Sequence, residues 1–490
     1  MYIQFIKFFN RKNGVFQTRF MGQVMLVILI ILILWSCSEK PANLSKTKVP
    51  PEVTLRPENE VRLSNDSDKT DIFRDAGLGL FIHWGPNSQL ATEISWPLNH
   101  ASEDYIEKYY ALAETFNPKQ FNAYEWARLA KLAGMEYVVF TAKHHDGFCM
   151  FDTAYSDFKI TNTPYSQDIT AQIAEAFRQQ GLLVGFYYSP GDFRYGYETG
   201  RFSERLMSPQ FDSPLPFGPL QKSFLEYEQG QVEELLSNYG DIFMLWFDGQ
   251  CDPLKKHSWR IKQDLFIGRG EIPTPEQEIP GQASDFAWES CMTTSWQWSY
   301  CANPDILDVE DIIKNLIRIR ARGGNMLLNI GPRPDGTISP PDEAILRELG
   351  QWMSLFGEAI QGVRPWIKTN EGDVWLTTKR TERTVYALAD LEYGLDGIDA
   401  PLGCRFSLKS VSTSPETIIT VLSQKGGVEW IEDEQGLHIT AARKQTIQIV
   451  RLPEALKSLP KFSNRSYSWG PAWPIAVKIT HVQPNPSTLE

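Results

Sequence analysis

The feature that most constrains the fold is a unit of one helix followed by one strand, which recurs along the middle of the chain. In the copy at residues 124–148, Trp126 and Leu129 share one face of the expected helix, Gly134 is a typical helix stop, and an apolar strand follows at 137–141. Further copies occupy residues 168–190, where Asp168 is the expected N-cap, 224–249 and 308–332. The strands are continuous apolar runs, which is typical of buried parallel strands. The pattern predicts a (β/α)8-like, TIM-type barrel.

The 490 residues leave room for a second domain after this barrel. Beyond about residue 363 the chain consists of short stretches rich in Thr, Val and Ile, broken by Gly, Pro and Asp. Such stretches are typical of antiparallel strands. We therefore expect a catalytic-type barrel at residues 71–362 and a C-terminal antiparallel β-sandwich at 363–490.

The N-terminus predicts export. Basic residues precede an apolar run of 12 residues at 24–35, which is too short to span a bilayer and suits a signal peptide. The run ends in "LWSC", which resembles a bacterial lipobox with Cys37 as the lipidated residue. We expect a signal peptide at 1–37, a flexible tether at 38–70, and a periplasmic or outer-membrane/cell-surface lipoprotein of a bacterium. A plain exported protein and a retained membrane anchor are the alternatives.

Charge and cysteine spacing argue against two other classes of protein. The net charge of −12 argues against a nucleic-acid partner, because phosphate binding needs clustered Lys and Arg. The six cysteines form no CxxC pair, which argues against a zinc ribbon or a thioredoxin-like site, although Cys291 and Cys301 could pair if the geometry allowed. The chain has 15 Trp, 18 Tyr and 27 Phe, which either fill the core or line a sugar pocket.

Histidines cluster after two expected strands. His83 ends one short apolar run, and His144, His145 and Asp146 end another. In parallel barrels the carboxyl ends of the strands carry the active site. Three imidazoles and a carboxylate could hold zinc, but adjacent residues on a strand point to opposite faces, and the HxH pair of barrel metallohydrolases is absent. We expect no metal; the histidines either satisfy the core or hydrogen-bond sugar hydroxyls.

Carboxylates follow further along the chain. Asp248 comes directly after an apolar strand that contains Trp246. It is either a turn-forming residue before Gly249 or a nucleophile in an apolar wall. Glu276 and Glu289 lie downstream. A retaining glycosidase needs two carboxyl groups about 5–5.5 Å apart, one ionised and one protonated.

Together, "LFIHWG", "KHHDGF", "FYYSP", "LWFDG", "WESCMT" and "GGNMLLNIGPRPDGTI" resemble the α-L-fucosidases of glycoside hydrolase family 29. The resemblance covers residues 71–364, with the motifs in the family's order. It implies a (β/α)8-like catalytic barrel followed by a β-sandwich, in agreement with the pattern of helices and strands.

The resemblance also implies roles for single residues. Asp248 matches the nucleophile, and Arg269 matches an arginine beside the acid/base. The residues that it assigns to the sugar are His83, Trp84, Trp96, His144, His145, Tyr188 and Trp246.

Two departures from the family pattern concern specificity and the acid/base. The family commonly has Glu just before the pocket tryptophan, where this chain has Ser95, with Glu93 two residues earlier. The acid/base is Glu276 by alignment of "TPEQ", with Glu289 as the rival.

The prediction is a retaining, exo-acting α-L-fucosidase that needs no cofactor and acts on a fucosylated oligosaccharide or glycoconjugate. It meets the membrane only through the N-terminal lipid anchor. A glycosidase for a related sugar such as an α-galactoside, a non-catalytic carbohydrate-binding relative and a metal-dependent hydrolase are the alternatives.

Overall fold

The computed structural model describes residues 50–199, 216, 218–379, 382–390, 403–442 and 473–485. All of them belong to the compact unit Thr47–Glu490. Cys37 and the predicted signal peptide lie outside the described residues. None of the helices in the described ranges is long and apolar enough to cross a bilayer.

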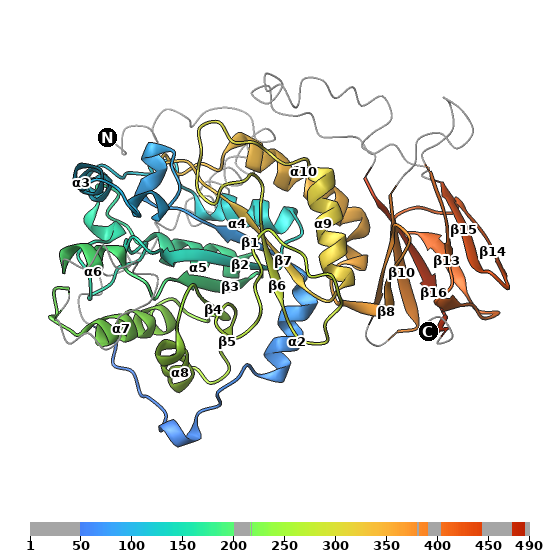
Figure 1. The fold of residues 1–490 in the computed structure, drawn as a ribbon, viewed down its shortest axis with the longest axis horizontal. Coiled ribbons are helices and arrows are strands. Elements are labelled where there is room, and N and C mark those ends of the chain that lie inside the picture. The colour runs from blue at the N-terminus through green and yellow to red at the C-terminus, as the bar shows by residue number, and fades with distance from the viewer. Residues whose placement is uncertain are drawn as a thin grey trace, which may run out of the picture. The chain divides into compact units, whose positions relative to one another are not determined.

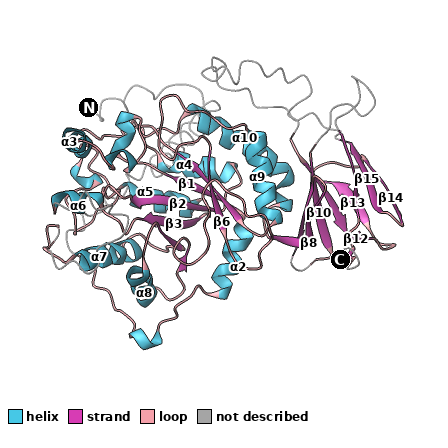
Figure 2. Ribbon diagram, viewed as in Figure 1, coloured by secondary structure: helices cyan, strands magenta, loops and turns pink. Residues whose placement is uncertain are grey.

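The first part of this unit is built on a parallel sheet in the order β5-β4-β3-β2-β1-β7-β6, surrounded by helices (Figures 1 and 2). Its strands are β1 (Leu78–Ile82), β2 (Tyr137–Lys143), β3 (Leu183–Tyr188), β4 (Met244–Phe247), β5 (Phe266–Ile267), β6 (Glu289–Thr293) and β7 (Asn325–Ile330). The helices of this part include α2 (Ser67–Ala76), α3 (Glu103–Ala111), α4 (Ala123–Leu132), α5 (Ile169–Gln179), α6 (Phe193–Glu198), α7 (Phe224–Ser237), α8 (Asp252–Ile261), α9 (Val309–Ala321) and α10 (Pro340–Phe356). The predicted TIM-like class is confirmed.

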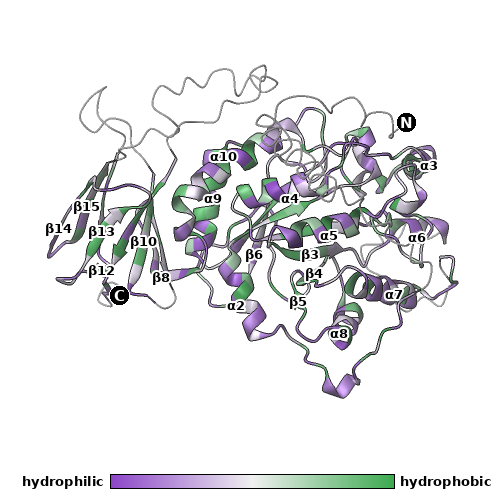
Figure 3. Cartoon of the chain, turned by 180° about the vertical axis from the view of Figure 1, so that it is seen from behind, coloured by the Kyte–Doolittle hydropathy of each residue, from purple (hydrophilic) through white to green (hydrophobic). Residues whose placement is uncertain are grey.

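The signals that begin and end the helices act as expected. Asp168 caps α5, because its side chain accepts a hydrogen bond from the Ala171 N–H. Gly134 and Gly181 follow α4 and α5 with φ of 82° and 74°, a conformation that favours glycine. The helices carry both hydrophobic and hydrophilic residues (Figure 3), as helices packed against a sheet do.

The sheet has seven regular strands, and a proline-rich segment takes the place next to β6. Residues 273–277 run parallel to β6: the N–H groups of Glu289 and Cys291 donate to the carbonyls of Pro273 and Pro275, at 3.1 and 3.0 Å. Proline has no N–H, so these two positions can accept hydrogen bonds but cannot donate them. The eighth place of the barrel is therefore occupied by an irregular segment, which explains why the described sheet has seven strands rather than eight.

Side chains of the parallel strands alternate between the barrel interior and the helices. The interior cluster includes Phe81, Tyr137, Tyr187 and Trp246, whereas their strand neighbours pack outward in the main core. Gly79 makes room for this interior packing, because a Cβ there would lie 2.3 Å from the Tyr137 ring.

The chain after the barrel forms antiparallel sheets, also as predicted. The larger sheet has the order β13-β16-β10-β9-β8, and two smaller ones are β11-β15-β14 and β12-β17. The strands are β8 (Val363–Glu371), β9 (Val374–Lys379), β10 (Thr384–Ala389), β11 (Gly403–Leu408), β12 (Val411–Ser412), β13 (Ile418–Val421), β14 (Val428–Asp433), β15 (Gly436–Ala442), β16 (Ile475–Thr480) and β17 (Gln483–Pro484).

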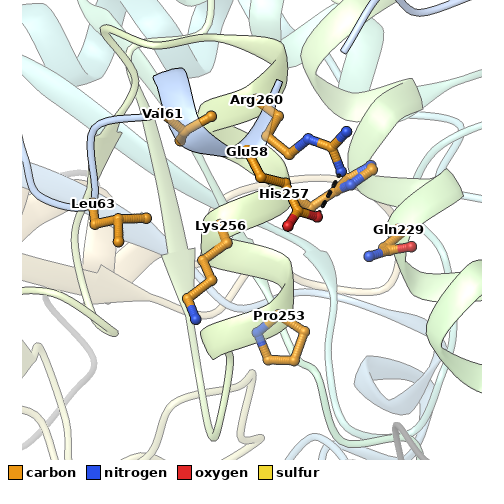
Figure 4. Close-up of a pocket in the computed structure, with 8 residues that line it drawn as sticks. All are labelled: Glu58, Val61, Leu63, Gln229, Pro253, Lys256, His257 and Arg260. Carbon is orange, nitrogen blue, oxygen red and sulfur yellow. Dashed lines mark hydrogen bonds and ion pairs between the residues drawn. The ribbon is translucent and has the colours of Figure 1, made fainter. Parts of the chain in front are cut away.

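The last part of the expected tether is docked on the barrel, in contrast to the prediction. The Arg56 N–H donates to the Arg260 carbonyl at 3.0 Å, and the Asn65 side chain exchanges two hydrogen bonds with the Ile267 backbone. Helix α2 begins at Ser67, inside the range predicted as tether. A pocket of about 340 Å³ lies between this segment and helices α7 and α8, lined by Glu58, Val61, Leu63, Gln229, Pro253, Lys256, His257 and Arg260 (Figure 4).

Candidate active site

Asp248 follows the carboxyl end of β4 and is held by three partners. Its Oδ2 accepts a hydrogen bond from the Tyr187 hydroxyl at 2.7 Å, and its Oδ1 accepts one from Arg269 at 2.7 Å. The His145 Nε2 lies 3.3 Å from Oδ2. Burial alone would raise the pKa of Asp248, but these partners outweigh it and hold the pKa well below its usual range. Asp248 is therefore a stable carboxylate, and its side chain keeps 21% exposure.

Arg269 joins Asp248 to a second carboxylate. The guanidinium forms an ion pair with Glu276, whose side chain is 45% exposed. It is fixed by the Thr274 hydroxyl, which accepts from Nε at 2.8 Å, and it lies 4.3 Å from the Trp246 ring centroid. Burial lowers the pKa of Arg269, and its acidic partners Asp248 and Glu276 raise it. The effect of the acidic partners is larger, so the pKa is raised. Two carboxylates thus share one permanent positive charge.

The histidines predicted as site residues converge on this pair. Strand β2 ends at Lys143, so the side chains of His144 and His145 need not point to opposite faces of the sheet. The His144 ring stacks on Tyr187 at 5.1 Å and is 5.5 Å from the His83 ring. Burial lowers the pKa of His83 to about 4 and that of His144 well below its usual range. Both imidazoles are therefore neutral at neutral pH.

Hydrogen bonds fix the orientation of each ring. The His83 Nδ1 is paired with the Asn329 Oδ1 at 2.6 Å, and the His145 Nδ1 with the Ser189 hydroxyl. The other His145 nitrogen, Nε2, is buried and lies against the Asp248 carboxylate.

Tryptophans border the histidines. Trp96 is 39% exposed and its ring lies 5.3 Å from that of His145. Trp298, which was not predicted, lies 5.2 Å from His83. Its backbone carbonyl accepts from Asn329 at 2.7 Å. Asn329 was also missed, although it stands inside the quoted "GGNMLLNIGP" motif.

Two residues assigned to the sugar lie elsewhere. Tyr188 points away from the barrel interior, and its hydroxyl donates to Gln231 of α7 at 2.7 Å. Strand alternation places its neighbour Tyr187 on Asp248 instead. Trp84 also faces outward, with its ring 5.0 Å from that of Trp126.

Glu289 is separated from the open site. It begins β6 at the amino end of the sheet, whereas Asp248 follows a carboxyl end. Its side chain is fully buried and accepts from the Tyr137 hydroxyl and, at 3.0 Å, from the Trp246 indole. Burial raises the pKa of Glu289 to about 7.

Ser95 and Glu93, where the sequence departs from the family pattern, hold the loops of the site. The Ser95 hydroxyl contacts the His144 Nδ1 at 2.7 Å and accepts from the Asp146 N–H at 2.8 Å. The Glu93 carboxylate accepts from the backbone N–H groups of Trp298 and Ser299. Ser95 thus orients an imidazole.

His144, His145 and Asp248 each offer a ligand atom within 4.8 Å of the others, which is close enough for a metal ion. Both oxygens of Asp248 already accept hydrogen bonds, and the adjacent Arg269 carries a positive charge that disfavours a cation. The donor set fits a carboxylate kept for attack on carbon better than a metal ligand. The expectation of no metal stays a prediction.

A barrel with paired carboxylates, neutral histidines and tryptophans at its strand ends has the composition of a glycoside hydrolase site. The family model described as Alpha-L-fucosidase matches residues 55–358. The chain belongs to the alpha-L-fucosidase family, as the sequence motifs predicted.

Similar proteins agree with this assignment. Human plasma alpha-L-fucosidase is 29% identical over 362 residues, which cover 64% of this chain and 75% of that protein. Rat tissue alpha-L-fucosidase is 29% identical over 406 residues, covering 75% and 85%. The structure of alpha-L-fucosidase isoenzyme 1 from Paenibacillus thiaminolyticus matches with a TM-score of 0.65 and 27% identity, over 85% of this chain and 99% of that one. A Bacteroides thetaiotaomicron alpha-L-fucosidase, solved as a trapped covalent intermediate, matches with a TM-score of 0.66 and 20% identity, over 88% and 100%.

Proposed function

We propose that this protein is a retaining, exo-acting α-L-fucosidase that removes terminal α-linked L-fucose from glycans, with Asp248 as nucleophile and Glu276 as acid/base. The observation that carries the proposal is the Asp248 carboxylate, bound by Tyr187 and Arg269 at the carboxyl end of β4. Family membership supports fucose as the sugar.

In the first step, Asp248 attacks the anomeric carbon while protonated Glu276 gives its proton to the leaving oxygen. A covalent glycosyl-enzyme forms and the aglycone departs as an alcohol. In the second step, Glu276 takes a proton from water, which attacks the same carbon and releases Asp248. The low pKa of Asp248 suits a nucleophile that must stay ionised throughout.

Arg269 links the two steps electrostatically. Before reaction its charge is shared between Asp248 and Glu276. Once Asp248 becomes a neutral ester, the guanidinium is paired with Glu276 alone.

His83, His144 and His145 then recognise sugar hydroxyls. The neutral imidazoles of His83 and His144 can donate or accept. Asn329, Ser95 and Ser189 set the orientations of the three rings. Trp96 supplies an exposed indole beside His145.

The test is turnover of an aryl α-L-fucoside beside aryl galactosides by the wild type and by Asp248→Ala, Glu276→Ala and Glu289→Ala. We expect fucose release by the wild type and loss of turnover with retained sugar binding in Asp248→Ala. Added azide should restore glycosyl transfer in Glu276→Ala alone, because azide attacks the glycosyl-enzyme as an anion and needs no base to remove a proton. Azide rescue of Glu289→Ala instead would reverse the assignment, and preference for a galactoside would change the substrate.

The N-terminal sequence supports a further proposal, that the protein is exported and anchored through a lipid on Cys37. A basic stretch, a short apolar run and a cysteine after "LWS" are together typical of a bacterial lipoprotein signal. The enzyme would then act on fucosylated glycans outside the cytoplasm.

A further inference from the structure

The loop that follows β6 carries two tryptophans in different surroundings. Trp298 is partly buried, with its ring 5.2 Å from His83 and 6.1 Å from Phe81. Trp296, two residues earlier, is 67% exposed, the most of any large hydrophobic side chain in the described ranges. A single exposed apolar side chain is common on protein surfaces, so its meaning depends on where the loop holds it.

The backbone on the Trp298 side is fixed to the sugar-binding residues. The Glu93 carboxylate accepts from the N–H groups of Trp298 and Ser299. The Ser299 hydroxyl accepts from the Ile94 N–H at 2.9 Å, next to Ser95 and Trp96. Asn329, which orients His83, also donates to the Trp298 carbonyl. This end of the loop therefore has a set position beside the imidazoles.

The other end of the loop is fixed to the acid/base segment. The Gln277 side chain donates to the Thr293 hydroxyl at 2.8 Å, and its N–H donates to the Cys291 carbonyl at 2.9 Å. Gln277 directly follows Glu276, so Glu276 and the start of the loop meet at the carboxyl end of β6. Trp296 thus lies on a loop that runs from the Glu276 side to the His83 side.

The proposed reaction indicates which part of the substrate lies beside this loop. Glu276 protonates the oxygen of the leaving group, so the sugar to which fucose is joined must lie on the Glu276 side. A pyranose presents a flat C–H face, and an exposed indole offers a matching apolar surface.

We propose that Trp296 forms the leaving-group subsite and stacks on the pyranose that carries the fucose. The inference rests on the proposed function and deepens it. Trp296 contributes to the binding of extended substrates and takes no part in the chemistry at the anomeric carbon.

The experiment compares Trp296→Ala with Trp430→Ala, a matched control at an exposed tryptophan of β14. The substrates are α-L-fucosyl fluoride, whose leaving group has no sugar, and a fucosylated disaccharide. For Trp296→Ala we expect KM for the disaccharide to rise about tenfold, the order of one lost aromatic contact, with kcat/KM for the fluoride unchanged. Trp430→Ala should change neither, and Trp296→Phe should recover most of the affinity.

Equal losses on both substrates in Trp296→Ala would indicate structural damage and overturn the proposal, as would no change on either. If the wild type hydrolyses neither substrate, the proposed function fails, and calorimetric binding then decides separately about Trp296. Equal affinities of wild type and Trp296→Ala for the disaccharide would exclude the subsite.

Discussion

Tyr187 and Tyr188 are adjacent in sequence and lie on opposite faces of β3. The Tyr187 hydroxyl donates to Asp248, whereas the Tyr188 hydroxyl donates to Gln231 of α7. Their identical chemistry makes them a natural pair of probes for which face of the strand serves the reaction.

Tyr187→Phe removes a hydrogen bond to a charged oxygen, worth about 1.5–3 kcal/mol. We expect kcat/KM on an aryl α-L-fucoside to fall about 10- to 100-fold. Tyr188→Phe should stay within about threefold of the wild type, since its hydroxyl does not reach the site. Equal effects of the two variants in steady-state kinetics would contradict this view of β3.

Glu289 gives a prediction about stability against pH. Its pKa is raised by burial to about 7, above the usual 4.5, so the folded state binds more protons than the unfolded state between these values. The contribution of Glu289 to the free energy of unfolding is therefore present below about pH 4.5 and is lost as the pH rises to about 7.

Glu289→Gln removes this titration while the amide keeps an acceptor for Trp246. Between pH 5 and pH 8 the stability of the variant relative to the wild type should increase by about 1–3 kcal/mol. Urea unfolding of both proteins at the two pH values measures it. Parallel stability curves would show that Glu289 does not change its protonation in this range.

At the scale of elements, the packing of β1 beside β2 depends on the absence of a side chain at Gly79. Gly79 pairs with Tyr137 in register, and the Tyr137 ring occupies the space where a Cβ would be, 2.3 Å away. The ring also carries the hydroxyl that donates to Glu289.

Gly79→Ala should lower the free energy of unfolding by about 1–3 kcal/mol, because the barrel interior cannot absorb an extra methyl without moving the ring. Gly281→Ala is the control, since a Cβ there meets nothing within 4 Å. Chemical denaturation measures both variants. A neutral Gly79→Ala would mean that Tyr137 can move at little cost.

Parts of this arrangement could be predicted from the sequence, for reasons that the elements make clear. Polar residues directly after apolar parallel strands meet at one edge, so the convergence of His144 and Asp248 follows from the motif order. The sequence does not show whether Tyr187 or Tyr188 contacts Asp248, because a strand that is apolar on both faces has no alternation of polar and apolar residues. Glu289 is the first residue of β6, whereas Asp248 directly follows β4, and this difference in position separates Glu289 from the site.

At the scale of the whole molecule, the division into a parallel part and an antiparallel part could be predicted because each has its own sequence texture. The docking of residues 56–66 on α8 and β5 could not. That segment is mostly polar and contains Pro57, and apart from Val61, which packs against the main core, its contacts are made by backbone groups and single polar side chains.

The proposed lipid anchor gives a prediction about the whole chain in the cell. In cells fed labelled palmitate the wild type should carry the label and Cys37→Ala should not, because the variant lacks the thiol that holds the acyl group. The kcat/KM of the variant on a small fucoside should equal that of the wild type. Absence of label from the wild type would leave a retained apolar segment or a plain exported form as the explanation.

The proline segment between β5 and β6 is a place in the barrel where the position of the acid/base residue can change without a change in the parallel sheet. Pro273 and Pro275 meet β6 through carbonyls alone, and Gln277 returns one N–H to the Cys291 carbonyl, so the ladder between this segment and β6 is short. Lengthening or shortening the chain between Thr274 and Glu289 would relocate Glu276 and leave Asp248, Tyr187 and the contacts of Arg269 with Thr274 in place. Homologous enzymes could therefore differ in where their acid stands, and in which leaving groups they favour, while sharing one nucleophile.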